Sequence, residues 1–163
     1  MAYRTSVLVV ANRTADSDGL AKALTRRPDA AEACFTLLVP ATHHGADGGS
    51  GFAAAREQLE SGLRKLRAAG LDVDGQVGDP DPIVAVHESW KPGAFDEVIV
   101  STLSRTASRW LEYDLPHRIA KLTDCPVEHV VPAEVERDIA RSRLKPERHA
   151  PQRALGPFAG PAA

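Results

Sequence analysis

The sequence predicts an α/β fold: a single domain built on a five-stranded parallel sheet with helices on both faces. Five short runs rich in Val, Ile and Leu are typical of strands buried on both sides. Four segments with apolar residues at helical spacing separate these runs, and such alternation favours parallel pairing with right-handed crossovers. The 163 residues suffice for one domain with its own core.

The first two strands are expected at Ser6–Ala11 and Phe35–Val39, where aliphatic residues follow one another without a polar interruption. Between them, Ser17 or Asp18 can cap a helix, because a short polar side chain accepts hydrogen bonds from the free N–H groups of a first turn. We expect this helix to end at Pro28.

The longest helix is expected from about Phe52 to Ala69, with Gly70 as its stop. Leu71–Val77 follows as a weaker strand in which acidic and apolar residues alternate, a pattern that favours the edge of the sheet. The helix carries one apolar stripe at spacings of three and four, formed by Phe52, Ala55, Leu59, Leu63 and Leu66.

The second half of the chain repeats the alternation. Asp81 is placed to cap a helix that begins at Pro82, and Phe95–Val100 is the fourth apolar run. Helical spacing continues from Trp110 to Leu122, but the proline inside this segment predicts two pieces, the second capped by Asp114.

The last strand is expected at Val127–Val131, which gives a domain over residues 4–131. A short helix is plausible over residues 132–144. Residues 145–163 hold four of the chain's 12 prolines, and we expect a disordered tail there.

Composition excludes several classes of function. The formal net charge is −2, from 20 basic and 22 acidic residues, so nothing favours nucleic acid or an anionic membrane as a partner. No apolar run approaches a membrane helix or a signal peptide, and we expect a cytoplasmic protein. Cys34 and Cys125 are too few for a zinc site or a disulfide framework and are expected in the core.

Polar residues crowd the point where the fourth strand meets the next helix. In open α/β sheets, ligands bind at such carboxyl ends of strands. Hydroxyls that donate and arginines that clamp phosphate would form an anion site, while the same residues also suit a solvated loop that caps a helix. The residues concerned are Ser101, Thr102, Ser104, Arg105, Thr106 and Arg109.

Four motifs give the chain a family resemblance: VLVVANRT at Val7–Thr14, GDPDPIVAV at Gly78–Val86, DEVIVST at Asp96–Thr102, and Cys125-Pro126-Val127. They resemble the universal stress protein domain, a Rossmann-like member of the adenine-nucleotide-binding α/β superfamily. The resemblance implies the strand order 3-2-1-4-5. It also implies frequent dimerisation through the last strand, and ATP or AMP binding in one branch of the family.

The ATP-binding branch has three glycines and a hydroxyl at positions that here hold Ser101, Ser104, Asp114 and Leu115. The glycines let the backbone approach a phosphate. A carboxylate on Asp114 would instead meet the phosphate, and like charges about 4 Å apart cost about 4 kcal/mol at an effective dielectric of about 20. That energy is roughly three decades of affinity, so ATP and AMP are disfavoured as cofactors.

The leading hypothesis is therefore a non-enzymatic, universal-stress-type regulatory or scaffold homodimer that does not bind ATP in the family's usual way. The alternative is a nucleotide- or small-anion-binding module that uses a Ser/Thr/Arg loop. No catalytic triad or metal-ligand spacing is evident. The candidate ligand residues are Asn12, Thr14, Ser101, Thr102, Ser104, Arg105, Arg109 and Asp114, and the candidate interface residues are Val127, His129 and Val131.

Overall fold

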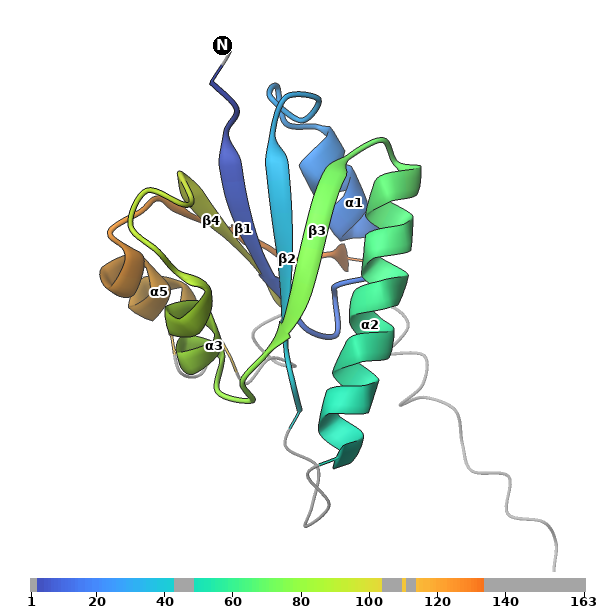
Figure 1. The fold of residues 1–163 in the computed structure, drawn as a ribbon. Coiled ribbons are helices and arrows are strands. Elements are labelled where there is room, and N and C mark those ends of the chain that lie inside the picture. Colours follow the sequence, from blue (N-terminus) through green and yellow to red (C-terminus); the bar gives the residue numbers. More distant parts are fainter. Residues whose placement is uncertain (1–2, 43–48, 104–109, 111–113, 134–163) are drawn as a thin grey trace, which may run out of the picture.

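The computed structural model describes residues 3–42, 49–103, 110 and 114–133. Five parallel strands form one sheet in the order β3-β2-β1-β4-β5, which confirms the expected fold class and strand order. Figure 1 shows α1 and α2 on one face of the sheet and α3 and α5 on the other. The strands are β1 (Ser6–Ala11), β2 (Cys34–Pro40), β3 (Asp72–Gly78), β4 (Glu97–Ser101) and β5 (Val127–Val130); the helices are α1 (Asp18–Thr25), α2 (Gly49–Ala68), α3 (Pro82–Ser89) and α5 (Leu115–Thr123).

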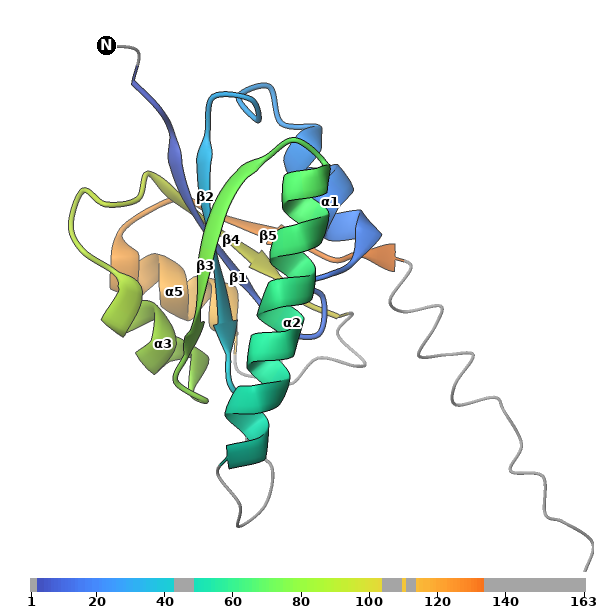
Figure 2. The same ribbon diagram turned by 45° about the vertical axis from the view of Figure 1, so that its right-hand side comes forward.

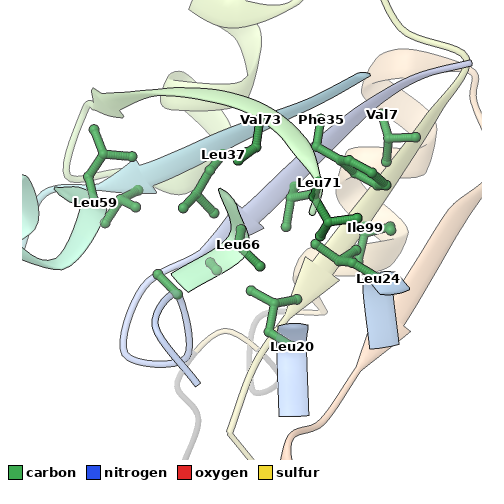
Figure 3. Close-up of a cluster of buried hydrophobic side chains, with 14 of the residues drawn as sticks. Val7, Leu20, Leu24, Phe35, Leu37, Leu59, Leu66, Leu71, Val73 and Ile99 are labelled. Atoms are coloured by element: carbon green, nitrogen blue, oxygen red, sulfur yellow. The ribbon is translucent and has the colours of Figure 1, made fainter. Parts of the chain in front are cut away.

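Side-chain alternation along the strands produces two apolar clusters, one under each helical layer. In the first cluster, Leu20 and Leu24 of α1 pack with Phe35 and Ile99 of the sheet (Figure 3). In the second cluster, Ile119 of α5 packs with strand residues of the opposite face. Residues 7–11 of β1 are fully buried because both layers cover the strand, as its continuous apolar sequence predicts.

Three local signals at helix ends are confirmed. The Ser17 hydroxyl accepts a hydrogen bond from the Leu20 N–H at 3.1 Å, and the Asp81 carboxylate accepts one from the Ile83 N–H at 2.8 Å. Gly70 follows α2 with φ +87°, a left-handed conformation that only glycine adopts without strain. These predictions are confirmed because each depends only on residues within one turn of the helix.

The long helix α2 crosses the face of the sheet obliquely (Figure 2). Two of its glycines let the helix backbone approach neighbouring segments of the chain closely. A Cβ atom at Gly62 would lie 2.8 Å from the Ala15 carbonyl oxygen and 3.0 Å from Leu37 Cδ2. Gly51 lies against Thr42 in the same way. The expectation that Phe52 belongs to the buried stripe is wrong, since its side chain is 46% exposed. The other residues of the stripe behave as expected, since Ala55, Leu59 and Leu66 are buried, and Phe52 is exposed in the first turn of α2.

Several boundaries also differ from expectation. The first helix ends at Thr25 rather than Pro28, and β5 ends at Val130 rather than Val131. Ala133 is helical, while the remainder of the expected C-terminal helix and the expected tail lie outside the described residues. The differences in α1 and β5 concern the last residues of a helix and of a strand, whose boundaries are the least sharply defined by sequence.

The two cysteines are half-buried rather than core residues. The Cys34 thiol lies 3.7 Å from a carboxylate oxygen of Asp72, and the Cys125 thiol lies 3.7 Å from the Phe95 carbonyl oxygen. Burial raises the pKa of the Cys125 thiol, which favours its protonated form. Each sits where a strand begins, outside the apolar clusters.

Replacing Gly62 with alanine tests the close approach of α2. Helix propensity alone would make Gly62→Ala stabilising by up to about 1 kcal/mol. The contact with the Ala15 backbone makes us expect a loss of about 1–3 kcal/mol in the free energy of unfolding, measured by urea denaturation. Glu60→Ala, on the exposed side of the same helix, is the control and should change stability by less than about 0.5 kcal/mol.

Candidate functional site

The strand order reverses between β1 and β4. From β1 the chain proceeds to β2 and β3 on one side, then crosses to β4 and β5 on the other. Ala11 at the end of β1 pairs with Ser101 at the end of β4, so the loops leaving these strands diverge from adjacent points. A doubly wound sheet places its ligand crevice at this switch point.

Thr14 and Ser101 bond to each other at the switch point. The Thr14 hydroxyl donates to the Ser101 carbonyl oxygen at 3.1 Å, and the two hydroxyl oxygens lie 2.7 Å apart. If the Thr14 proton is directed at that carbonyl, the Ser101 hydroxyl is the donor to Thr14 Oγ1, and we assign it so. Both residues are only 1% exposed. A phosphate oxygen would therefore have to displace one of these contacts to accept a hydrogen bond from either hydroxyl.

Thr102 ties the same loop to β5. Its N–H donates to the Val130 carbonyl oxygen at 3.0 Å, and its hydroxyl donates to the Leu103 carbonyl oxygen at 2.8 Å. The His129 ring nitrogen Nε2 lies 2.6 Å from that hydroxyl oxygen. Since the Thr102 proton is already directed at Leu103, we assign Nε2 as the protonated, donating nitrogen. Thr102 therefore connects the end of β4 to the edge strand.

Asn12 directly follows β1, and Asp114 directly precedes α5. The Asn12 amide donates to the Pro40 carbonyl oxygen at 3.3 Å and so ties the end of β1 to the end of β2. Asp114 stands at the first position before α5, as expected, but its side chain makes no cap hydrogen bond. The expected side-chain cap is therefore wrong. The residue adopts a left-handed conformation, φ 50°, whereas the capping residues Ser17 and Asp81 are extended.

The exposure of Asp114 also lowers the repulsion expected between its carboxylate and a phosphate. Solvent screening brings the cost for charges about 4 Å apart to about 1 kcal/mol, or roughly fivefold in affinity. The buried hydroxyl pair is therefore a larger obstacle to a phosphate than the carboxylate is.

Four of the residues singled out for anion binding, Ser104, Arg105, Thr106 and Arg109, lie outside the described residues. The candidate interface residues all lie on or directly after β5. Val127 is half-buried, His129 is exposed, and Val131 is 41% exposed just beyond the strand. The structure thus brings Thr14 and Ser101 into contact, with Thr102 next along the chain, whereas Asn12 bonds to the end of β2 and Asp114 is exposed before α5.

Sequence reasoning missed a clamp on the loop after β1. The Asp16 carboxylate accepts hydrogen bonds from the Gln58 amide at 2.6 Å and the Ser61 hydroxyl at 3.1 Å, and Lys65 pairs with Asp18 at 2.8 Å. A hollow of about 530 Å³ opens beside this clamp on the α2 side. No sequence signal marks these contacts, because the partners are more than 40 residues apart. The clamp holds Thr14 in position for Ser101.

In the described part of the chain, no group of three His, Cys, Asp or Glu residues is arranged to hold a metal ion. None of the helices in that part has the length and apolar character needed to cross a membrane.

No protein-family model and no curated protein matches this sequence. Solved structures do match its fold. A universal stress protein in complex with cAMP has a TM-score of 0.56 and 17% identity over 81% of this chain and 100% of its own. A universal stress protein from Archaeoglobus fulgidus has a TM-score of 0.56 and 11% identity, covering 77% of this chain and 93% of its own.

A universal stress protein family protein from Arabidopsis thaliana with AMP bound has a TM-score of 0.54 and 18% identity, over 81% of this chain and 94% of its own. The fold of this chain is therefore that of the universal stress proteins.

Replacing Thr14 with valine tests the buried pair. Thr14→Val keeps the side-chain shape but leaves the Ser101 hydroxyl without its acceptor, so we expect a loss of about 1–3 kcal/mol in unfolding free energy. Adding Ser101→Ala should recover part of that loss, because the stranded hydroxyl is removed. The control Thr36→Val, at a half-buried position of β2, should stay within about 0.5 kcal/mol. Equal losses at Thr14 and Thr36 would contradict the pairing.

Proposed function

We propose that this chain is a non-enzymatic regulatory or scaffold protein of the universal stress type that does not hold ATP in the family's usual pose. The buried contact between Thr14 and Ser101 carries this proposal. It occupies the switch point, where the resemblance places the first glycine of a phosphate loop at residue 101. A nucleotide phosphate would have to break that contact and leave two buried hydroxyls to find new partners, at a cost of about 1–3 kcal/mol each.

The hydroxyls at the switch point also lack the features of nucleophiles. A serine or threonine nucleophile needs a base that accepts its proton and an open approach for the substrate. The Ser101 proton is directed at Thr14, and the Thr102 proton at Leu103, although Thr102 contacts an imidazole. Both hydroxyls are buried. These contacts support a binding or scaffold role over hydrolysis.

Isothermal titration calorimetry tests the proposal. We expect ATP, AMP and cAMP each to bind with a Kd above about 1 mM, which corresponds to less than about 4 kcal/mol of binding energy. Returning the glycines in the variant Ser101→Gly/Ser104→Gly/Asp114→Gly should produce measurable ATP binding, because the hydroxyl pair and the carboxylate are both removed. Asp114→Asn alone should tighten binding by no more than about fivefold.

Asp124→Asn is the matched control for Asp114→Asn, since both residues are left-handed aspartates that flank α5. It should leave binding unchanged. Micromolar affinity of the natural chain for ATP would contradict the proposal. A glycine variant that binds no better than the natural chain would contradict the role given to these three positions.

A second candidate function is a small-anion or nucleotide module, favoured by the cAMP and AMP in two of the structures with this fold. Here Ser101, Ser104, Arg105 and Arg109 would replace the glycine cradle, with Asn12 and Thr14 opposite. AMP binding by the natural chain that is lost in Arg105→Ala/Arg109→Ala would establish this function instead. Unchanged affinity in that variant would exclude the arginines as the clamp.

We also propose that two copies pair through β5. This strand lies at one end of the sheet order and has only four residues. Its Glu128 and His129 side chains are exposed, and Val131 directly after it exposes an apolar surface. A pair of such strands would extend the sheet and cover these residues.

Sedimentation tests this pairing. At tens of micromolar, the chain should sediment at twice its mass of 17.4 kDa, and Val131→Asp should shift it towards 17.4 kDa by placing a charge in the interface. Val84→Asp is the matched control, because Val84 on α3 is 39% exposed and Val131 is 41% exposed. A natural chain that sediments only at 17.4 kDa would contradict pairing.

A further inference from the structure

One arginine fastens the edge strand β5 to the body of the domain. Arg27, just after α1, reaches three carboxylates: Asp29 at 3.2 Å, Glu97 of β4 at 2.6 Å and Glu128 of β5 at 3.0 Å. We call these four residues the Arg27 clasp. They come from three segments of the chain that are separated by up to 101 positions. The clasp adds side-chain contacts to a strand whose main chain bonds to β4.

The charges of the Arg27 clasp do not balance. One guanidinium faces three carboxylates, so two negative charges are in excess. Glu97 is the most enclosed of the three, with a side chain 24% exposed against 57% for Glu128. Burial raises the pKa of Glu97, Arg27 lowers it, and the carboxylates of Asp29 and Glu128 raise it further. The net shift is upward, although Arg27 lies at ion-pair distance.

We propose that the Arg27 clasp is a proton-sensitive fastener, in which uptake of one solvent proton by the Glu97 carboxylate tightens the attachment of β5 to β4. The charged groups that face Glu97 are Arg27 and Asp29 from the α1–β2 connection and Glu128 from β5. With Glu97 neutral, its repulsion of the other two carboxylates ends. The Arg27 guanidinium then pairs with two charged carboxylates, those of Asp29 and of Glu128 on β5.

The direction of the pH dependence follows from linkage. The ordinary pKa of a glutamate is 4.5, and that of Glu97 is raised in the folded chain. The added stability is therefore fully present below pH 4.5 and is lost as the pH rises through the raised value. If β5 also forms the interface proposed above, the clasp would make assembly sensitive to pH; that consequence rests on the proposed function, whereas the clasp does not.

Hydrogen exchange of two amides, one in β4 and one directly after it, measures the attachment directly. The N–H of Val98 donates to Pro126, and the N–H of Thr102 donates to Val130, each at 3.0 Å. Their protection factors, corrected for the intrinsic exchange rate at each pH, should rise several-fold between about pH 7.5 and pH 5. The amide of Cys34, bonded to Thr5 between β1 and β2, should change much less.

Two variants make the test decisive. Glu97→Gln, which mimics the neutral carboxyl, should remove the pH dependence at Val98 and Thr102. The control Asp74→Asn removes a carboxylate that pairs with Arg67 at 3.3 Å on β3 and should leave the dependence intact. The proposal is overturned if Glu97→Gln keeps the natural pH dependence, if the natural chain shows none, or if the Cys34 amide changes equally. Parallel sedimentation reports assembly separately, so loss of pairing leaves this test valid.

Discussion

The buried hydrogen bond between the hydroxyls of Thr14 and Ser101 is the contact on which the character of this domain depends. Strand order brings the ends of β1 and β4 together, with Ala11 paired to Ser101, and Thr14 follows three residues after β1. Once buried, two hydroxyls must bond to something, and here they bond to each other. The two hydroxyls at the switch point are therefore partnered within the protein's own polar interior.

The fold resembles that of nucleotide-bound structures, whereas the hydroxyls at the switch point bond to each other. The chain has the architecture of universal stress proteins, some of which carry cAMP or AMP in their solved structures. A fold positions loops but does not determine what they bind. Residue 101 illustrates the difference: a glycine there would leave backbone free for an anion, whereas this serine adds a hydroxyl that Thr14 engages. The clamp from α2 onto Asp16 fixes the Thr14 side of this contact.

The sequence predicts the fold well wherever the determining contacts are local. The apolar run of β1, the Asp81 cap and the Gly70 stop each depend on a few neighbouring residues, and all three are confirmed. The prediction fails at Phe52 although Ala55, Leu59 and Leu66 of the same stripe are buried. Helical periodicity predicts which residues share a face but not how far along the helix that face is covered, and Phe52 lies in the first turn of α2.

The candidate site is only partly predictable from the sequence. Thr14, Ser101 and Thr102 were identified from their place after strands, but their mutual bonding required the register of β1 against β4. Asp114 was placed correctly before α5, yet its left-handed backbone removes the expected cap and exposes the carboxylate. The Arg27 clasp had no signal at all, since its members are far apart in the chain.

The most direct test of the closed switch point is an NMR titration of the ¹⁵N-labelled chain with AMP, followed at the amides of Thr14, Ser101 and Thr102. A closed switch point predicts that these three signals keep their positions through the millimolar range of AMP. Saturable shifts of the same signals at micromolar AMP would show that the hydroxyl pair opens for a nucleotide and would contradict the closed site.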